Sequence, residues 1–327
     1  MTIQLIADRA NVSIATVSRI INRTGVVKEA TRRKVLDVMD ELNYTPPAPA
    51  KKAQSDTILV CLPDLKNPFN SLIIDGIQAS AYTHHYHVLI LQSKIPYLSY
   101  DDYKTILGNQ NLAGVILLTS VADPKLIDDF SKQVPLVMCS EWHDRTDVSF
   151  VSIDDVHAAR KAVDHLIASG RKRIAMLNSS LRHKYARHRE QGYREALAAA
   201  GLVINNSWIS YVPTVNYNLA MSHATHILNN THRPDAFFAT SDVYAVAIIR
   251  AAKKLGLRVP EDIAVTGFDN IELSTMTDPP ITTIEQPCFE IGYQSCELLL
   301  EHIHSPQADP KQIFLDTELI VRESTSL

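Results

Sequence analysis

Residues 13–22 carry side chains suited to contact with a nucleic acid. Between Arg9 and Lys28 the sequence contains no Asp or Glu. A solvated helix face usually mixes both signs of charge, and acidic side chains would repel phosphate, whereas short polar or basic ones can enter a major groove about 12 Å wide. The segment therefore indicates DNA binding through Ser13, Ile14, Ala15, Thr16, Ser18, Arg19 and Asn22.

Helical patterns place these side chains on one face. Apolar spacing predicts a helix over 3–10, and after the turn at 11–13 the Ser13 hydroxyl can cap a second helix over 14–22. Two helices three residues apart form a helix-turn-helix, and a third helix over 28–43 would close the core. The expected inward side chains are Val17, Ile20, Ile21, Val35, Leu36, Val38, Met39 and Leu42. An all-helical cap or protein-interaction module is the alternative.

The charge of the chain is unevenly distributed. The 327 residues have a formal net charge of −4, which by itself argues against a nucleic-acid partner. Residues 1–55, however, hold nine Lys and Arg against five Asp and Glu, while 56–327 hold 23 against 31. A basic segment thus precedes an acidic body that is too long for a single hydrophobic core.

Cysteine use and hydropathy indicate a cytoplasmic protein. Cys61, Cys139, Cys288 and Cys296 form no CxxC pair, and a chain of this size does not need disulfides, so buried reduced thiols are expected. No apolar run approaches the roughly 20 residues of a membrane span, and the first residues have a helical pattern rather than that of a signal peptide. We expect no membrane partner.

The order of residues over 6–22, continued at 31–35 and 41–46, resembles the DNA-binding headpiece of the LacI/GalR family of transcriptional repressors. The resemblance implies that Ile14, Ala15 and Arg19 read base edges, with Arg19 able to fork onto guanine. It also implies phosphate contacts from Thr2, Ser13, Thr16, Asn22, Lys28 and Thr31. The phosphate contacts would position the headpiece, and the base contacts would specify the sequence.

The segment after Tyr44 departs from that family's pattern. The family usually has a hinge helix here, whose Leu wedges into a minor-groove step and kinks the DNA. This chain has Ala53 at the wedge position, and Pro47 and Pro49 favour extended backbone before them. We expect a plain tether, or a helix that tolerates its prolines in the first turn. Either form predicts that the protein bends its operator weakly. It would then either tolerate variation in the spacing of the two half-sites or depend on a second DNA-bound regulator.

From Thr57 onward, apolar strand-like runs alternate with helical patterns, which predicts doubly wound parallel sheets. The expected strands are 58–62, 87–91, 114–119, 136–139, 173–177, 236–240 and 263–267. The expected helices are 70–82, 100–110, 156–169, 187–200, 217–229, 243–255 and, in the tail, 289–303, followed by a strand near 313–321. Ligands of open α/β sheets bind at the carboxyl ends of strands, here in a cleft between two lobes.

The expected fold is therefore multidomain. An all-α helix-turn-helix headpiece over 1–46 and a linker over 47–56 precede an α/β core over 57–327. The core would consist of two doubly wound parallel-sheet subdomains, about 57–155 and 156–286, with the tail 287–327 packing on both.

Several motifs of the core also resemble the LacI/GalR family, whose effector domain is related to periplasmic sugar-binding proteins. They are Pro63-Asp64, Asn67-Pro68-Phe69, Arg187-x-Arg189, Ser241-Asp242, 259–270 and 278–284. Further segments at 56–60, 267–271, 288–292 and 318–322 are most similar to a branch of the family that responds to cytidine. The resemblance implies a small-molecule effector, either a nucleoside such as cytidine or a sugar.

Side chains in these motifs suit a hydroxylated ring. Asp242 and Asp269 can accept hydrogen bonds from sugar hydroxyls, Arg189 can donate to hydroxyls or a ring oxygen, and Phe69 and Trp142 offer aromatic faces. Asp242 could instead cap a helix, and Trp142 could belong to the core. The full expected effector site is Asp64, Phe69, Asn70, Trp142, Tyr185, Arg189, Asp242 and Asp269.

Other classes of function find little support. The His84-His85-x-His87 and His223-x-x-His226 clusters lack Cys or acidic partners at useful spacing, so we expect no metal site. No P-loop, GxGxxG, HExxH or GxSxG motif occurs, so neither an enzyme nor a cofactor is expected. The expectation is an effector-controlled repressor that binds a palindromic operator as a homodimer. The alternative is a stand-alone sugar- or nucleoside-binding protein, disfavoured by the helix-turn-helix.

Overall fold

The protein is described by a computed structural model that covers residues 3–21, 27–42, 44, 55–92, 111–118, 124–144 and 147–326. The contacts between Cα atoms divide it into two units, Met1–Ser55 and Asp56–Leu327. The linker with Pro47, Pro49 and Ala53 lies outside the described residues, as do Thr2, Asn22, the side chain of Ala15 and the helix expected over 100–110.

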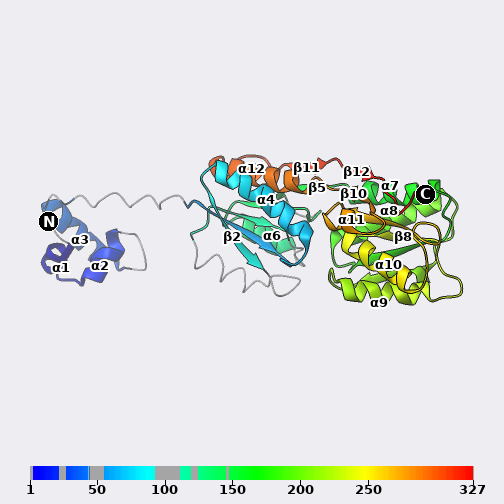
Figure 1. Ribbon diagram of the computed structural model, residues 1–327. Helices are drawn as coiled ribbons and strands as arrows, with labels where there is room; N and C mark the ends of the chain where they lie inside the picture. The colour runs from blue at the N-terminus through cyan, green and yellow to red at the C-terminus, as the bar shows by residue number, and fades with distance from the viewer. Residues whose placement is uncertain are drawn as a thin grey trace. The chain divides into compact units, whose positions relative to one another are not determined.

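The first unit contains three helices, α1 (Ile3–Ala10), α2 (Ile14–Ile21) and α3 (Glu29–Glu41) (Figure 1). Asn11 takes the left-handed backbone conformation that the turn between α1 and α2 requires, and the Ser13 hydroxyl accepts a hydrogen bond from the Thr16 amide at 3.2 Å. The core consists of Ile6, Ala7, Ala10, Val17, Ile20, Val35, Val38 and Met39.

One expected core residue of this unit points outward. Leu36 is 46% exposed, although its neighbours Val35, Val38 and Met39 are buried. Those three residues follow the i, i+3, i+4 spacing of one helix face, and Leu36 is rotated about 100° away from Val35. The apolar surface that closes the three-helix core is therefore narrower than the sequence pattern suggested.

The first sheet of the second unit has the strand order β11-β5-β4-β3-β1-β2, with parallel pairing throughout. Its strands are β1 (Thr57–Leu62), β2 (His87–Gln92), β3 (Gly114–Leu117), β4 (Leu136–Cys139), β5 (Ser149–Ile153) and β11 (Gln312–Leu315). The helices of this lobe are α4 (Pro68–Thr83), α6 (Pro124–Ser131) and α12 (Cys288–His304). Helices α4 and α12 lie side by side in Figure 1, and Gly76 and Gly292 allow their backbones to approach closely.

The second sheet has the order β12-β10-β9-β8-β6-β7, and only the described β10–β12 pair is antiparallel. Its strands are β6 (Ile174–Ser179), β7 (Ile209–Val212), β8 (Ala236–Ala239), β9 (Ala264–Asp269), β10 (Thr282–Glu285) and β12 (Glu318–Ile320). Its helical segments are α7 (Asp155–Ala168), α8 (Lys184–Ala199), η1 (Asn206–Trp208), α9 (Tyr217–Leu228), α10 (Asp242–Lys254) and α11 (Leu273–Met276).

Alternate residues of the central strands enter different hydrophobic clusters. Ile174 and Met176 pack with α7 and α8, whereas Ala175 and Leu177 pack with α9 and α10. Figure 1 shows these two helix pairs on opposite sides of the sheet. The doubly wound architecture predicted from the strand and helix alternation is confirmed.

Strands β5, β7 and β10 are not predicted by the sequence pattern. Strands β5 and β10 have buried polar side chains, and the side chains of β7 are partly exposed. In β5, the Ser149 hydroxyl bonds His302 and the Ser152 hydroxyl donates to the Ser140 carbonyl. In β10, Thr282 is fully buried and its hydroxyl donates to the Arg322 carbonyl. Strand β7 is a short, half-exposed edge strand. The single strand expected over 313–321 is wrong, since β11 and β12 belong to different sheets.

Candidate functional site

Helix α2 presents a distinct outer face in the first unit. Val17 and Ile20 are buried against α1 and α3, while Ile14 is 47% exposed and Ser13 and Arg19 are exposed. The Arg19 side chain is exposed on this face. An exposed helix face with an Arg and short neighbours can enter a DNA groove.

Two further candidate DNA contacts lie at the start of α3. Lys28 is the residue before the helix and is exposed, and Thr31 is partly exposed one turn later. The Lys28 carbonyl accepts the Thr31 amide hydrogen bond at 2.9 Å, which fixes the start of the helix. A cation and a hydroxyl at a helix N-terminus are suited to contact with phosphate.

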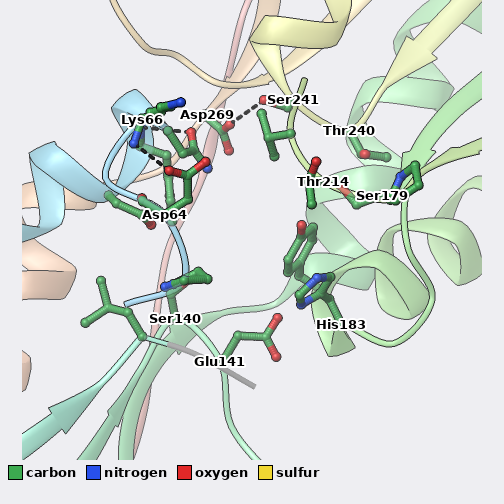
Figure 2. A pocket seen from close by; sticks show the side chains of 18 of the residues that line it. Asp64, Lys66, Ser140, Glu141, Ser179, His183, Thr214, Thr240, Ser241 and Asp269 are labelled. Carbon is green, nitrogen blue, oxygen red and sulfur yellow. Dashed lines mark hydrogen bonds between the residues drawn. The ribbon is translucent and has the colours of Figure 1, made fainter. Parts of the chain in front are cut away.

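The second unit contains a cavity of about 370 Å³ where strands of both sheets end. The wall residues follow β1 (Asp64), β4 (Ser140 and Glu141) and β8 (Thr240 and Ser241) directly. Figure 2 shows these side chains, with Asp269 and His183, arranged around one open space. The cavity lies at the carboxyl edge of the parallel strands, where open α/β sheets bind ligands.

Six of the eight expected effector residues line this cavity. They are Asp64, Phe69, Asn70, Tyr185, Arg189 and Asp269. Asn70 is held in place by its own side-chain amide, which donates to the Asp64 carbonyl at 2.6 Å. Phe69 is the second residue of α4, and the side chain of the Asn67 cap accepts the Phe69 amide hydrogen bond.

Arg189 anchors the wall of the cavity beside Asp269. Its Nε donates to Asp155 Oδ1 at 2.7 Å and its Nη1 donates to the Thr240 carbonyl at 2.7 Å. The guanidinium carbon lies 3.6 Å from the centroid of the Phe268 ring, a cation–π contact. Although burial opposes the charged form, the carboxylates of Asp155 and Asp269 hold the pKa of Arg189 above its ordinary value.

Asp269 ends β9 and faces the same cavity. Its Oδ1 accepts from Gln286 Nε2 at 2.7 Å, and its Oδ2 accepts from the Ser241 hydroxyl at 3.2 Å. Burial raises the pKa of Asp269 to about 6, although the Arg189 charge acts in the opposite direction. The carboxyl is thus mostly ionised at neutral pH and can accept hydrogen bonds from a bound ligand.

Two expected effector residues do not line the cavity. Trp142 stacks on Phe150, with ring centroids 4.6 Å apart, and the Nζ of Lys184 lies 2.8 Å from its ring centroid. Asp242 is fully buried at the start of α10, but the helix cap position belongs to Ser241. Trp142 is thus packed by Phe150 and Lys184, and the Asp242 carboxyl group accepts from the Ile271 amide and the Thr283 hydroxyl.

Other wall residues were missed in the sequence. They include Lys66, Gln92, Ser140, Glu141, Ser179, His183, Thr214, Thr240 and Ser241. Glu141 is almost fully buried, and its Oε2 accepts from the Lys184 amide at 3.4 Å. Ser140 and Glu141 directly follow an expected buried strand, and that position alone would have predicted them.

Metal ligation and membrane insertion can be judged for the described part of the chain. Within it, no group of three His, Cys, Asp or Glu side chains could hold a metal ion. No described helix is long and apolar enough to cross a membrane. The four cysteines are buried and form no disulfide, as expected.

Comparison with known proteins decides the family. Residues 2–47 match "Bacterial regulatory proteins, lacI family", and residues 163–325 match "Periplasmic binding protein-like domain". The chain is 34% identical to the HTH-type transcriptional repressor CytR of Escherichia coli (strain K12), over 99% of this chain and 96% of that protein. The chain belongs to the LacI family. It is accordingly a DNA-binding transcriptional repressor with an effector-binding core, and not an enzyme.

Other LacI family members are similarly related. The HTH-type transcriptional repressor PurR of Photobacterium profundum is 31% identical, over 99% of this chain and 98% of that protein. The lac repressor dimer bound to operator and the anti-inducer ONPF has a TM-score of 0.75 at 27% identity, with 99% of each chain covered. Because the CytR and PurR identities are nearly equal, overall likeness does not identify the effector.

Proposed function

We propose that this LacI family repressor binds a roughly palindromic operator as a homodimer and is controlled by a nucleoside such as cytidine, with a sugar as the second candidate. The observation that carries the proposal is the buried Arg189–Asp269 pair on the wall of a ligand-sized cavity. The half-sites would lie about one helical turn apart, as the two-fold symmetry of a helix-turn-helix dimer requires.

DNA recognition would depend on the outer face of α2. Arg19 would donate two hydrogen bonds to a guanine, and Ile14 would offer apolar contact to a thymine methyl group. Ser13, Thr16, Lys28 and Thr31 would contact phosphates. The family resemblance adds Ala15 as a base contact and Thr2 and Asn22 as phosphate contacts.

The cavity suits a ligand rich in hydrogen-bond donors. Asp64, Glu141 and Asp269 bring carboxylates to the wall, and Arg189 is already engaged by Asp155. Adjacent ribose hydroxyls can donate to Asp269, and an amino group on a base can donate to Glu141. Phosphorylated ligands are disfavoured, because a phosphate would meet the buried carboxyl groups of Glu141 and Asp269.

Regulation would follow from the position of the cavity between two lobes. A ligand that contacts both lobes stabilises one relative arrangement of them and so shifts the population of dimers able to bind the operator. The linker with Ala53 would bend DNA weakly, so the repressor would tolerate variation in half-site spacing or act with a second DNA-bound regulator.

A thermal-shift screen of the full chain tests the ligand class. The panel contains cytidine, uridine, adenosine, ribose, glucose and cellobiose, each with wild type and with Asp269→Asn. A ligand at 100 times its dissociation constant stabilises the folded state by about 2.7 kcal/mol. We expect cytidine to raise the melting temperature of wild type only. A panel in which no compound does so, or in which both proteins respond alike, contradicts the proposal.

A further inference from the structure

Asp242 is fully buried next to the effector cavity without lining it. Its Oδ2 accepts from the backbone amide of Ile271 at 2.9 Å, and its Oδ1 accepts from the Thr283 hydroxyl at 2.6 Å. One side chain at the start of α10 thus binds the turn after β9 and strand β10. A buried carboxyl group is costly unless such partners satisfy it.

The sequence leaves space for this carboxyl group. Gly267 lies in β9, and a Cβ atom there would approach Asp242 Oδ1 more closely than real Cβ atoms do. The absence of a side chain at this position therefore allows Asp242 to lie directly against the strand that ends in Asp269.

The turn that Asp242 binds has an unusual backbone. Asp269 has φ 111° and the next residue, Asn270, has φ 54°, and neither is glycine. Such conformations persist only where the surroundings impose them. Asn270 Oδ1 accepts from Arg322 Nη2 at 2.7 Å, and the following amide, that of Ile271, is the one bound by Asp242.

We propose that Asp242 is a positioning residue for the effector site, holding the turn at 269–271 so that the Asp269 carboxylate faces the ligand. The proposal rests on the proposed function. Asp242 itself touches no ligand, and it acts through the Ile271 amide. Once the turn is held, Asp269 keeps its contacts to Gln286 and Ser241 and needs no reorganisation when a ligand enters.

The hydrogen-bonding capacity of the side chain distinguishes this role from simple core packing. Asn can replace both contacts, since its oxygen can accept from Ile271 and its amide can donate to the Thr283 oxygen. Ala can make neither contact. The Thr283→Val variant is the matched control, because it removes the second contact and leaves the Ile271 contact intact.

The experiment measures cytidine affinity by calorimetry and backbone amide exchange by mass spectrometry on the full chain. We expect Asp242→Ala to weaken cytidine binding by about tenfold or more and to increase exchange in the peptide that contains Ile271. Asp242→Asn and Thr283→Val should stay within about threefold of wild type and keep the protection of Ile271.

Two outcomes overturn the proposal. One is unchanged amide protection at Ile271 in Asp242→Ala, and the other is a loss of affinity in Thr283→Val as large as that in Asp242→Ala. If Asp242→Ala does not fold, Gly267→Ala displaces the same carboxyl group and should give the same loss. If wild type binds no cytidine, ribose or glucose, the proposed function fails, while the exchange measurement still tests the contact of Asp242 with the turn.

Discussion

Arg189 Nη1 lies 3.8 Å from Asp269 Oδ1, and each residue is only 5% exposed. The shorter contact of Arg189 is with Asp155, at 2.7 Å. Asp269 is therefore close enough to a cation to remain ionised near neutral pH, yet it is not fully neutralised by it. This division of one guanidinium between two carboxylates leaves Asp269 without a close ion pair, and its oxygens accept from Gln286 and Ser241 instead.

Replacement of Arg189 separates folding from ligand binding. Arg189→Ala leaves the carboxyl groups of Asp155 and Asp269 buried without a cation, which should cost about 3–5 kcal/mol of stability. Arg189→Lys keeps the charge but cannot donate to Asp155 and the Thr240 carbonyl with the same geometry. We expect Arg189→Lys to fold, bind operator and lose the ligand-induced rise in melting temperature.

Calorimetric melting and operator binding by fluorescence anisotropy check this prediction. Arg194→Lys, on the outward part of the same helix, is the control and should keep the ligand response. A wild-type response in Arg189→Lys would remove Arg189 from the effector site.

Ligand affinity should depend on pH through Asp269. Its pKa, raised by burial to about 6, means that the carboxyl group is mostly protonated at pH 5 and mostly ionised at pH 7. Ligand hydroxyls donate to the ionised form, so affinity should fall about tenfold from pH 7 to pH 5. Asp269→Asn should bind weakly with little pH dependence.

The raised pKa of Asp269 affects the stability of the ligand-free protein in the opposite direction: stability rises as pH falls, whereas ligand affinity falls. The folded state holds this proton more tightly than the unfolded chain, whose Asp pKa is about 3.9, so the Asp269 contribution to stability rises as pH falls from 6 toward 4. Burial also lowers the pKa of His183 on the cavity wall. The His183→Gln variant should therefore keep the pH dependence of ligand affinity. If the variant loses that pH dependence, the titrating group is His183 and not Asp269.

Arg19 and Lys28 should differ in how their removal affects operator binding. Arg19→Ala should cost about 1–3 kcal/mol on the preferred operator and relax selection at one base position. Lys28→Ala should weaken binding to all sequences alike and reduce the slope of the salt dependence by about one. Binding measured on matched and mismatched duplexes at several salt concentrations tests this difference, and equal behaviour of both variants would contradict it.

The fold could be predicted where each element has one dominant signal. The buried strands β1, β3, β4 and β8 are continuous apolar runs, and the amphipathic helices have clear spacing. Strands β5 and β10 could not be predicted, because buried Ser and Thr side chains reach partners elsewhere in the chain. Polar residues inside a core look like loop residues until those partners are known.

The candidate site could be predicted only in part for the same reason. Asp64 follows β1, Asp269 ends β9, and both line the cavity, as expected for residues at the carboxyl ends of parallel strands. Trp142 and Asp242 also follow strands, but their side chains are occupied by Phe150 and by Ile271 and Thr283. A residue's position in the topology can be read from sequence, whereas the direction of its side chain depends on contacts across the fold.

The proline-containing linker predicts tolerance of operator spacing. If Ala53 cannot unstack a central base step, the two headpieces do not depend on one bent DNA geometry. Inserting one to three base pairs between half-sites should weaken binding less than about tenfold. An Ala53→Leu variant should show a steeper loss, and a steep loss in wild type itself would contradict the prediction.

Ligand control of operator binding is the central claim, and one titration tests it directly. An operator duplex selected from random DNA by the full chain is titrated with wild type and with Asp269→Asn, each with and without saturating cytidine or the sugar that raises the melting temperature. We predict that the ligand changes the operator affinity of wild type by at least about tenfold and leaves that of Asp269→Asn unchanged. An operator affinity of wild type that is the same with and without every bound ligand would contradict it.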